Sequence, residues 1–362
     1  VQSHCLMRFV LLLSCLVACS GDASYGTEAD DLGAGQYQNP LLRAQDGTYA
    51  ECPDPNVKQF GANYFMVCTS PHVGQTAQAF PIHWSSDLVH WHFIGHVFTQ
   101  GDHPSWALPP GAGGVYWAPE LNRIDGKWHL VFAAKTSNPS KHGSLAIGVA
   151  TADAIAGPWK ATSSPIVSQG DGSISGPGDT NSGRIDPSIV RDPKSNDLFL
   201  YYVYQPRYVH VAKLTANGLG VVKGSDKALF ETSQPWEETT VEGVEAHAHD
   251  GKIVLLYSGA STWDGSYAVG VARADSPYGP FDKHQGPILS SSASGKLVGP
   301  GHSSQWVTGP DGKTWLLYHV QRRGQTGHSE PRLLSLDEVT FDGSGWPKVG
   351  NGHPSESPRA LP

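Results

Sequence analysis

The sequence predicts an all-β protein, a single-domain β-propeller with five blades. The first indication is its composition: glycine and proline, with 42 and 27 residues, make up about a fifth of the 362-residue chain, and only 16% of the residues are charged. Such a composition is typical of short strands joined by turns rather than of a helical bundle or a disordered segment. The second indication is a repeat of about 60 residues that occurs five times, because repeats of about 40–50 residues or more are typical of propellers.

Each repeat begins with the same two strands. A short strand is followed by a tight turn containing Gly or Asn, and then by a strongly apolar strand. The turns at Asp125-Gly126, Asp250-Gly251 and Asp311-Gly312 are strong hairpin signals. The five repeats begin at Asp54, Ala118, Asp186, Glu242 and Gly301.

Two further strands complete most repeats. We expect a third strand at Phe80–Trp84, Leu145–Ala150, Val209–Ala212 and Tyr267–Ala272. We expect a turn-rich fourth strand at Trp91–Ile94, Gly157-Pro158-Trp159, Gly279-Pro280-Phe281 and Gly345-Trp346-Pro347. Four strands in each of five repeats predict a five-bladed propeller. The alternative is a β-sandwich whose hairpins match by chance, and the five matched units argue against it.

The N-terminus has the pattern of a targeting segment. Arg8 precedes the apolar run Phe9–Ala18, which is too short to span a bilayer. The stretch Leu16–Cys19 resembles a bacterial lipobox, so we expect an exported protein anchored to a bacterial membrane through a lipid on Cys19, facing the periplasm or the exterior. The alternative is an ordinary secretion signal cleaved near Ala23. The expected parts are a signal peptide at 1–19, a linker at 20–36, the propeller at 37–350 and a C-terminal tail at 351–362.

Charge and cysteine content limit the partners and predict a disulfide. The net charge of −8 includes no run of Lys or Arg, so we do not expect a nucleic-acid partner, and we expect a monomer. After processing, Cys52 and Cys68 remain beside Cys19, in an oxidising compartment. They flank a predicted hairpin that turns near Gly61, so we expect them to form a disulfide, with two buried free thiols as the alternative.

The inner strand of each blade points its start at the central channel of a propeller. The residues at these starts are Asp54, Trp117, Asp186, Glu242 and His302. Three of them are acids that come from separate blades. Carboxylates brought together push the pKa of one group up and leave another ionised. This difference is what acid/base hydrolysis of a glycosidic bond requires.

The motifs around these residues resemble those of glycoside hydrolase family 43. The resemblance extends from about Asn39 to Pro347, and seven motifs occur in the family's order. They are Cys52-Pro53-Asp54-Pro55, Ser85–Trp91, Tyr116-Trp117-Ala118-Pro119-Glu120, Ile185-Asp186-Pro187-Ser188, Val241-Glu242-Gly243, Ser276–Phe281 and Pro300-Gly301-His302.

The resemblance implies roles for the three acids. Asp54 is the general base that activates water, Glu242 is the general acid, and Asp186 raises the pKa of Glu242 and holds it in place. The family inverts the anomeric configuration, which requires roughly 6.5–9.5 Å between acid and base. Glu245 is a local rival for the acid, but the family's Glu-Gly pair matches Glu242-Gly243. Where the family often continues with Pro, this chain has Val244.

Three further residues are substrate-binding candidates. Trp117 either stacks on a sugar face or packs between blades. Arg332 resembles an arginine that contacts the sugar in some relatives, and its alternative is a surface position. His302 is a candidate for binding substrate, and also for holding Ca²⁺ or another cation in the channel with water as further ligands. We expect no required cofactor.

The substrate class follows from the resemblance. It implies arabinose- or xylose-containing plant polysaccharides or oligosaccharides. Because Gly301-His302 is followed by Ser303-Ser304, we favour an α-L-arabinofuranosidase or an arabinan endo-1,5-α-L-arabinosidase. The alternatives are a β-xylosidase and a carbohydrate-binding propeller without catalysis, although the latter needs no trio of acids.

Overall fold

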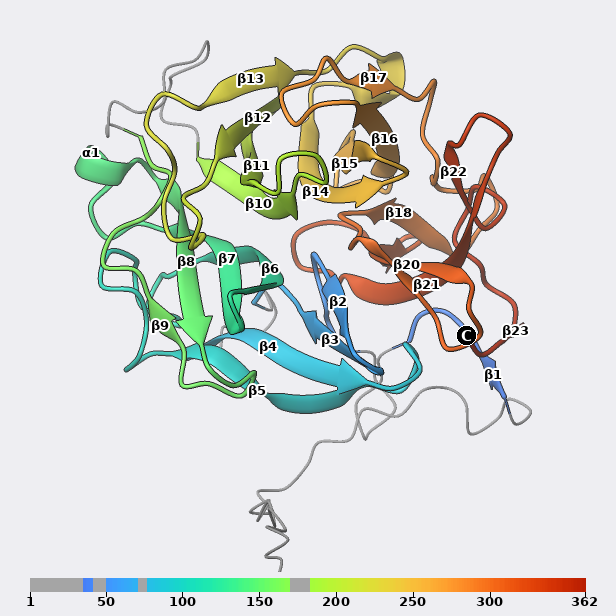
Figure 1. Cartoon of the computed structure of the whole chain (residues 1–362). Coiled ribbons are helices and arrows are strands. Elements are labelled where there is room, and N and C mark those ends of the chain that lie inside the picture. The colour runs from blue at the N-terminus through green and yellow to red at the C-terminus, as the bar shows by residue number, and fades with distance from the viewer. Residues whose placement is uncertain (1–34, 42–49, 71–76, 170–182) are drawn as a thin grey trace, which may run out of the picture.

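The protein folds into five antiparallel sheets around a central axis (Figure 1), which confirms the predicted five-bladed propeller. The computed structural model describes residues 35–41, 50–70, 77–169 and 183–362. Blades one and two consist of β2 (Asn56–Phe60), β3 (Asn63–Val67), β4 (Gln78–Ser85) and β5 (His92–Thr99), and of β6 (Tyr116–Ile124), β7 (Lys127–Lys135), β8 (Leu145–Ala152) and β9 (Lys160–Ala161).

The other three blades follow in chain order. Blade three consists of β10 (Arg184–Arg191), β11 (Leu198–Tyr204), β12 (Tyr208–Lys213) and β13 (Lys227–Phe230). Blade four consists of β14 (Val241–His249), β15 (Lys252–Gly259), β16 (Ala268–Ala274) and β17 (Asp282–Lys283). Blade five consists of β18 (Leu297–Gly301), β19 (Trp306–Thr308), β20 (Thr314–Arg322), β21 (Leu333–Phe341) and β22 (Pro347–Val349).

Helices are short in the described part of the chain. They are the single turn α1 (Pro139–His142) and the 3-10 helix η2 (Pro235–Glu237). Among these residues, no helix reaches the length and apolarity needed to cross a membrane.

Three of the outer strands begin two or three residues later than the sequence suggested: β22 starts at Pro347 instead of Gly345, and β9 and β17 are displaced in the same direction. The Gly157-Pro158 and Gly279-Pro280 pairs form turns, and β9 and β17 start a few residues beyond them. Both glycines have a positive φ, which extended strands do not adopt, and proline lacks the N–H that a strand ladder requires. The sequence therefore located these blade edges correctly but placed their strands too early.

The hydrophobic core lies between neighbouring blades. Alternate residues of one strand point to opposite faces of a sheet, and here each face packs against a different blade. In β15, Leu255 and Tyr257 pack toward blade three, whereas Val254 and Leu256 pack toward blade five. Because the sheets are buried on both faces, their middle strands are almost continuously apolar, as the sequence of each repeat indicated.

The two ends of the described chain pair with each other in a separate two-stranded sheet. Strand β1 (Gln36–Tyr37) pairs with β23 (Arg359–Ala360), and the two lie beside blade five (Figure 1). The Tyr37 hydroxyl donates to the Leu336 carbonyl of β21 at 3.0 Å. The segments that we expected to be the end of a linker and a C-terminal tail are thus fixed to the fifth blade.

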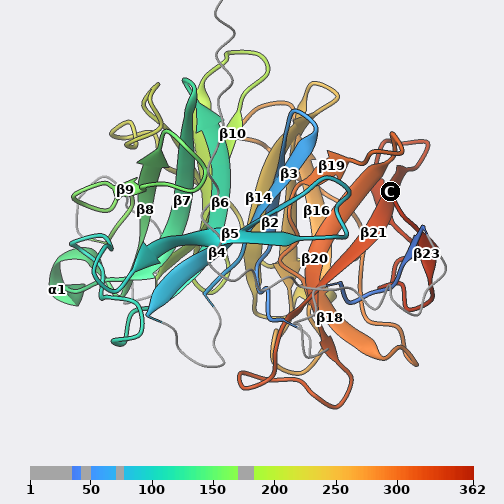
Figure 2. The ribbon, with the colours of Figure 1, turned by 90° about the horizontal axis from the view of Figure 1, so that it is seen from below.

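The inner strands β2, β6, β10, β14 and β18 run through the middle of the molecule, where several are seen side by side in Figure 2. Most have a bulge near the pocket end, because the pairing register shifts there. A residue with positive φ lies at or beside this point in every blade, namely Asp54, Ala118, Asp186, Gly243, Gly299 and His302. Bulges bend a strand and redirect its side chains, and here they do so at the start of the channel.

Candidate active site

One pocket at the end of the inner strands contains all six predicted catalytic and substrate-binding residues. They are Asp54, Trp117, Asp186, Glu242, His302 and Arg332. They come from all five blades, so the pocket is the mouth of the central channel. Four of these residues lie at the start of their blade's inner strand, as the sequence predicted. His302 differs from the prediction, because β18 begins at Leu297 and His302 directly follows its end, and Arg332 lies just before β21.

Asp54 is buried and held by strong partners. Arg332 donates from Nη1 to Asp54 Oδ1 at 2.7 Å, and Thr69 donates from Oγ1 to Oδ2 at 2.6 Å. Nδ1 of His302 lies 3.3 Å from Oδ1. Burial by itself would raise the pKa of Asp54, but the Arg332 charge, with His302, His319 and the Thr69 hydroxyl, outweighs burial and holds this pKa well below its usual range. Asp54 is therefore a carboxylate.

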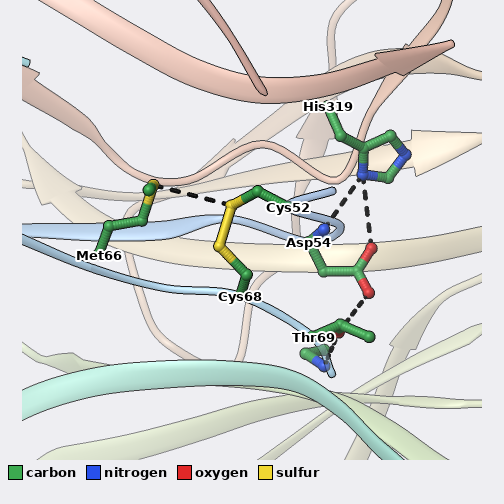
Figure 3. The surroundings of a disulfide bond; sticks show 7 residues. Cys52, Asp54, Met66, Cys68, Thr69 and His319 are labelled. Atoms are coloured by element: carbon green, nitrogen blue, oxygen red, sulfur yellow. Dashed lines mark hydrogen bonds and ion pairs between the residues drawn. A yellow bond between two sulfur atoms is a disulfide. The ribbon is translucent and has the colours of Figure 1, made fainter. Parts of the chain in front are cut away.

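His319 supports Asp54 from β20 as a neutral ring. Its Nδ1 accepts the backbone N–H of Asp54 at 3.2 Å (Figure 3), so Nδ1 carries no proton in this arrangement. Burial, followed by the Arg332 charge, lowers the pKa of His319 well below its usual value. Since an uncharged imidazole forms no ion pair, the electrostatic stabilisation of ionised Asp54 comes mainly from Arg332.

A disulfide connects the segment that contains Asp54 to the segment that contains Thr69. Cys52 and Cys68 are bonded, with their Cα atoms 5.3 Å apart. Figure 3 shows Asp54 and Thr69 directly beyond the two cysteines. The Thr69 N–H donates to the Pro53 carbonyl at 2.9 Å, and the Thr69 hydroxyl oxygen accepts the Ala118 N–H of blade two at 2.7 Å. The carboxylate is thus connected to the second blade through one threonine.

Asp186 and Glu242 lie in a different electrostatic environment. Oδ2 of Asp186 accepts the Gly243 N–H at 2.7 Å, and Oε1 of Glu242 accepts the Tyr267 hydroxyl at 2.9 Å. Burial, and then the charge of Glu242, raise the pKa of Asp186 well above its usual value. Burial also raises the pKa of Glu242, although the Tyr267 hydrogen bond opposes this. These two carboxyls therefore bind a proton more readily than Asp54 does.

Gly243 explains the Glu-Gly motif and separates Glu242 from its rival. A Cβ at Gly243 would lie 3.2 Å from both the His302 ring and the Ser258 hydroxyl, and the residue has a φ of 61°. Only glycine fits this position without strain. Glu245 lies beyond it in the channel, where Asn56 donates to its Oε1 at 3.0 Å. Because Glu245 does not line the pocket, the geometry favours Glu242 as the acid.

The structure also addresses the alternatives for Trp117 and Arg332. Trp117 packs against the core between blades three and four and also lines the pocket, so its stacking on a sugar stays a prediction. Arg332 is 8% exposed, so it is not a surface arginine.

A cation near His302 stays a prediction. In the described ranges, no group of three or more His, Cys, Asp or Glu side chains is arranged to hold a metal ion. The nearest carboxylate oxygen, Asp54 Oδ1, is already bound by Arg332, whereas Ca²⁺ requires six to eight oxygen ligands. The donor set seen here does not fit a calcium site on protein atoms alone.

The sequence did not identify as site residues Thr69, Tyr267 and His319, which contact the acids, nor the further pocket-lining residues Gln205, Thr262, Trp263 and His328. His319 had a detectable signal, since it is the one charged-type side chain in the apolar stretch Leu316–Val320. Thr69 and Tyr267 adjoin strand ends and look like ordinary strand residues. Their roles depend on contacts with Asp54 and Glu242 that only the folded chain makes.

Comparison with known proteins identifies the family to which the chain belongs. The model of the glycosyl hydrolases family 43 matches residues 37–347. A non-reducing end alpha-L-arabinofuranosidase of Bacteroides ovatus is 25% identical over 87% of this chain and 53% of its own length. A xylan 1,3-beta-xylosidase of Vibrio is 27% identical over 70% of this chain and 44% of its own.

The chain thus spans about half the length of these curated relatives. An extracellular endo-alpha-(1->5)-L-arabinanase of Thermotoga petrophila is 24% identical over 94% of this chain and 75% of its own length. Among solved structures, a thermostable family-43 glycoside hydrolase superimposes with a TM-score of 0.72 at 25% identity, covering 90% of this chain and 99% of the other. With its propeller fold and a family match over nearly the whole described region, the chain belongs to glycosyl hydrolases family 43.

Proposed function

We propose that the protein is an inverting glycoside hydrolase in which Asp54 is the general base and Glu242 the general acid. The observation that carries this proposal is the contrast within one pocket: Arg332 and Thr69 keep Asp54 ionised, while burial and mutual charge keep a proton on the coupled pair Asp186 and Glu242. An acid and a base that differ in this way at the same pH are what the reaction needs.

The reaction then proceeds in one displacement. Asp54 accepts a proton from a water molecule as the water oxygen bonds to the anomeric carbon. Glu242 donates its proton to the glycosidic oxygen as that oxygen leaves. Since the water attacks opposite the leaving group, the configuration inverts. Asp186, fixed by the Gly243 N–H, keeps Glu242 protonated through its charge when it is ionised.

We propose that the substrate contains arabinose, as an α-L-arabinofuranoside or a 1,5-linked arabinan. Support comes from the arabinofuranosidase and arabinanase names of two relatives and from the Gly301–Ser304 sequence, which resembles the arabinan-directed branch. Trp117 would pack against the sugar in the pocket, and Arg332 and His302 would contact it beside Asp54.

Hydrolysis of xylosides is the second candidate. The observation in its favour is that relatives named xylan 1,3-beta-xylosidase, from Vibrio, and beta-xylosidase, from Bacillus subtilis, are similar at 27% and 26% identity. The pocket residues named above serve either sugar, because arabinofuranose and xylopyranose are both pentoses with the same hydrogen-bonding groups.

A product screen tests the proposal. The purified protein is incubated with linear arabinan, arabino-oligosaccharides, xylo-oligosaccharides and the two nitrophenyl pentosides, and NMR records the anomer that forms first. We expect hydrolysis of the substrates of one pentose, arabinose or xylose, and a product whose anomeric configuration is inverted. Product with retained configuration would contradict the roles of Asp54 and Glu242. Binding without release from any substrate would instead indicate a carbohydrate-binding propeller.

We further propose, from the sequence alone, that the protein is exported, lipid-anchored at Cys19 and monomeric. Cys19 lies outside the residues that the structure describes. Labelling cells with a fatty-acid analogue, and comparing the protein with its Cys19→Ala variant, tests the anchor, and light scattering of the purified protein tests the monomer.

A further inference from the structure

An exposed tryptophan stands at the rim of the active-site pocket. Trp263 is 40% exposed, although large aromatic side chains normally bury most of their surface. One face of its ring stacks on His328, with the ring centroids 3.2 Å apart and the planes at 22°. Both rings line the same pocket as Asp54 and Glu242. The covered face is fixed by His328, so the remaining surface is available to a ligand.

The loop that carries Trp263 is held in place by its own hydrogen bonds. It connects β15 to β16, and the Tyr267 N–H closes it by donating to the Ser261 carbonyl at 3.1 Å. The Trp263 N–H donates to Ser261 Oγ at 3.1 Å, and the Ser266 N–H donates to Asp264 Oδ1 at 2.9 Å. A ring presented on such a loop loses little conformational freedom when it binds a ligand.

The same loop ends at the general acid. Tyr267, the residue that closes the loop, donates its hydroxyl to Glu242 Oε1 at 2.9 Å. Through Tyr267, the loop of Trp263 is therefore connected to the proposed proton donor. His328, which backs Trp263, belongs to the loop between β20 and β21 that also carries Arg332, so the aromatic pair is held by blades four and five.

We propose that Trp263, backed by His328, is the platform for the sugar ring that leaves, so that the substrate is an oligosaccharide or polysaccharide rather than a small glycoside. The inference rests on the proposed function, because it uses Glu242 as the acid. The C–H face of a sugar packs well on an aromatic ring. Thr262 and Gln205, which line the same pocket, supply polar groups for the sugar hydroxyls.

The chain offers a matched control at Trp84. This tryptophan of blade one is 37% exposed and also stacks on a histidine, His92, with centroids 4.9 Å apart and planes at 26°. It does not line the active-site pocket. A general effect of removing an exposed, histidine-stacked indole will therefore appear in Trp84→Ala as well as in Trp263→Ala.

The test compares two substrates that share one sugar and differ in the leaving group. One is the oligosaccharide that the wild type hydrolyses best, and the other is the glycosyl fluoride of the same sugar, whose leaving group is too small to reach Trp263. We expect Trp263→Ala to lower the ratio of the two kcat/KM values roughly tenfold, mainly through KM for the oligosaccharide. Trp263→Phe should retain most of the ratio, and Trp84→Ala should leave both values unchanged.

Each outcome decides the proposal. An unchanged ratio in Trp263→Ala, or an equal change in Trp84→Ala, would overturn the platform while leaving hydrolysis intact. If the wild type hydrolyses neither substrate, the proposed function fails, and calorimetric titration with the oligosaccharide then tests the platform alone: equal affinity of wild type and Trp263→Ala would reject it.

Discussion

Two clusters of acidic side chains lie in the same channel and differ in the partners that their oxygen atoms have. The pocket trio is Asp54, Asp186 and Glu242, and the channel cluster is Glu120, Glu245 and Lys58. In the channel cluster, the Lys58 ammonium lies 3.1 Å from Glu120 and 3.7 Å from Glu245. In the pocket trio, Arg332 forms an ion pair with Asp54 at 2.7 Å, and the structure shows no such pair for Asp186 or Glu242 within the described part of the chain.

The difference lies in which oxygen atoms remain free. Glu120 is 1% exposed, and its oxygens accept from Lys58, Asn122 and the Ile189 N–H. Glu120 is thus buried with its oxygens hydrogen-bonded, and it links the inner strands β2, β6 and β10. None of its oxygens is available to react with a ligand. Glu242 has one oxygen bound by Tyr267 and faces the pocket. Residue type and strand position therefore do not distinguish a structural acid from a reactive one, whereas hydrogen-bond satisfaction and access do.

The same substitution in each cluster gives the largest contrast. Glu242→Gln should lower kcat by about 10²–10⁴-fold, because it removes the proton donor but keeps the side-chain shape. The loss should be smaller on a dinitrophenyl glycoside, whose leaving group needs no proton. Glu245→Gln, three residues away, should keep kcat near that of the wild type. Steady-state kinetics on both substrates measure this, and a similar loss in both variants would remove the distinction between the clusters.

Removing the charge of Lys58 should lower stability, in contrast to the loss of activity expected for Glu242→Gln. Lys58→Met leaves Glu120 and Glu245 buried without a counter-charge, which should cost about 3–5 kcal/mol of unfolding free energy. The charge of Lys58 opposes the upward shift that burial and Glu120 impose on the pKa of Glu245. Its loss therefore raises this pKa further, and the destabilisation should shrink as the pH falls and Glu245 becomes neutral. Urea unfolding at several pH values checks this, and a loss that grows on acidification would contradict it.

The disulfide should affect both stability and the base. It closes a separation of 16 residues, so Cys52→Ser with Cys68→Ser should lower the unfolding free energy by about 3 kcal/mol. Because the bridge holds the segments of Asp54 and Thr69, kcat should fall below the wild-type value even where the variant is fully folded. Thr69→Val is the companion variant: it removes the hydrogen bond to Asp54 and the acceptor of the Ala118 N–H but keeps the bridge, so a loss of about 1–3 kcal/mol of stability with reduced kcat is expected. Full kcat in both variants would argue against this support of the base.

The smallest expected effect is a shift in the pH profile. The Tyr267 hydroxyl stabilises ionised Glu242 and so lowers its pKa. Tyr267→Phe should therefore raise this pKa, and the alkaline limb of kcat/KM, where the acid loses its proton, should move to higher pH by roughly half to one unit. Tyr257→Phe is the control, because Tyr257 donates to Glu237 outside the pocket at 2.8 Å. A shift to lower pH, or an equal shift in the control, would contradict the assignment.

Much of the fold was predictable because it is repeated. Tight turns followed by apolar strands recur in each unit, and three of the turns are Asp-Gly, so the pattern is recognisable even where one repeat is irregular. The last strands of the blades were harder, since β9 and β17 are two residues long and follow Gly-Pro turns. The pairing of β1 with β23 joins residues more than 300 positions apart, and no local sequence pattern predicts this pairing.

The sequence by itself determined the five blades, the three acids and the end of each blade at which they lie. It did so because strand alternation, turn residues and motif order are local properties of the chain. The tertiary structure decided in which direction, and by which neighbours, the pKa of each acid is shifted. Arg332 reaches Asp54 across 278 residues and Tyr267 reaches Glu242 across 25, and the pKa of a buried carboxyl depends on the charges and donors that packing places within hydrogen-bonding distance.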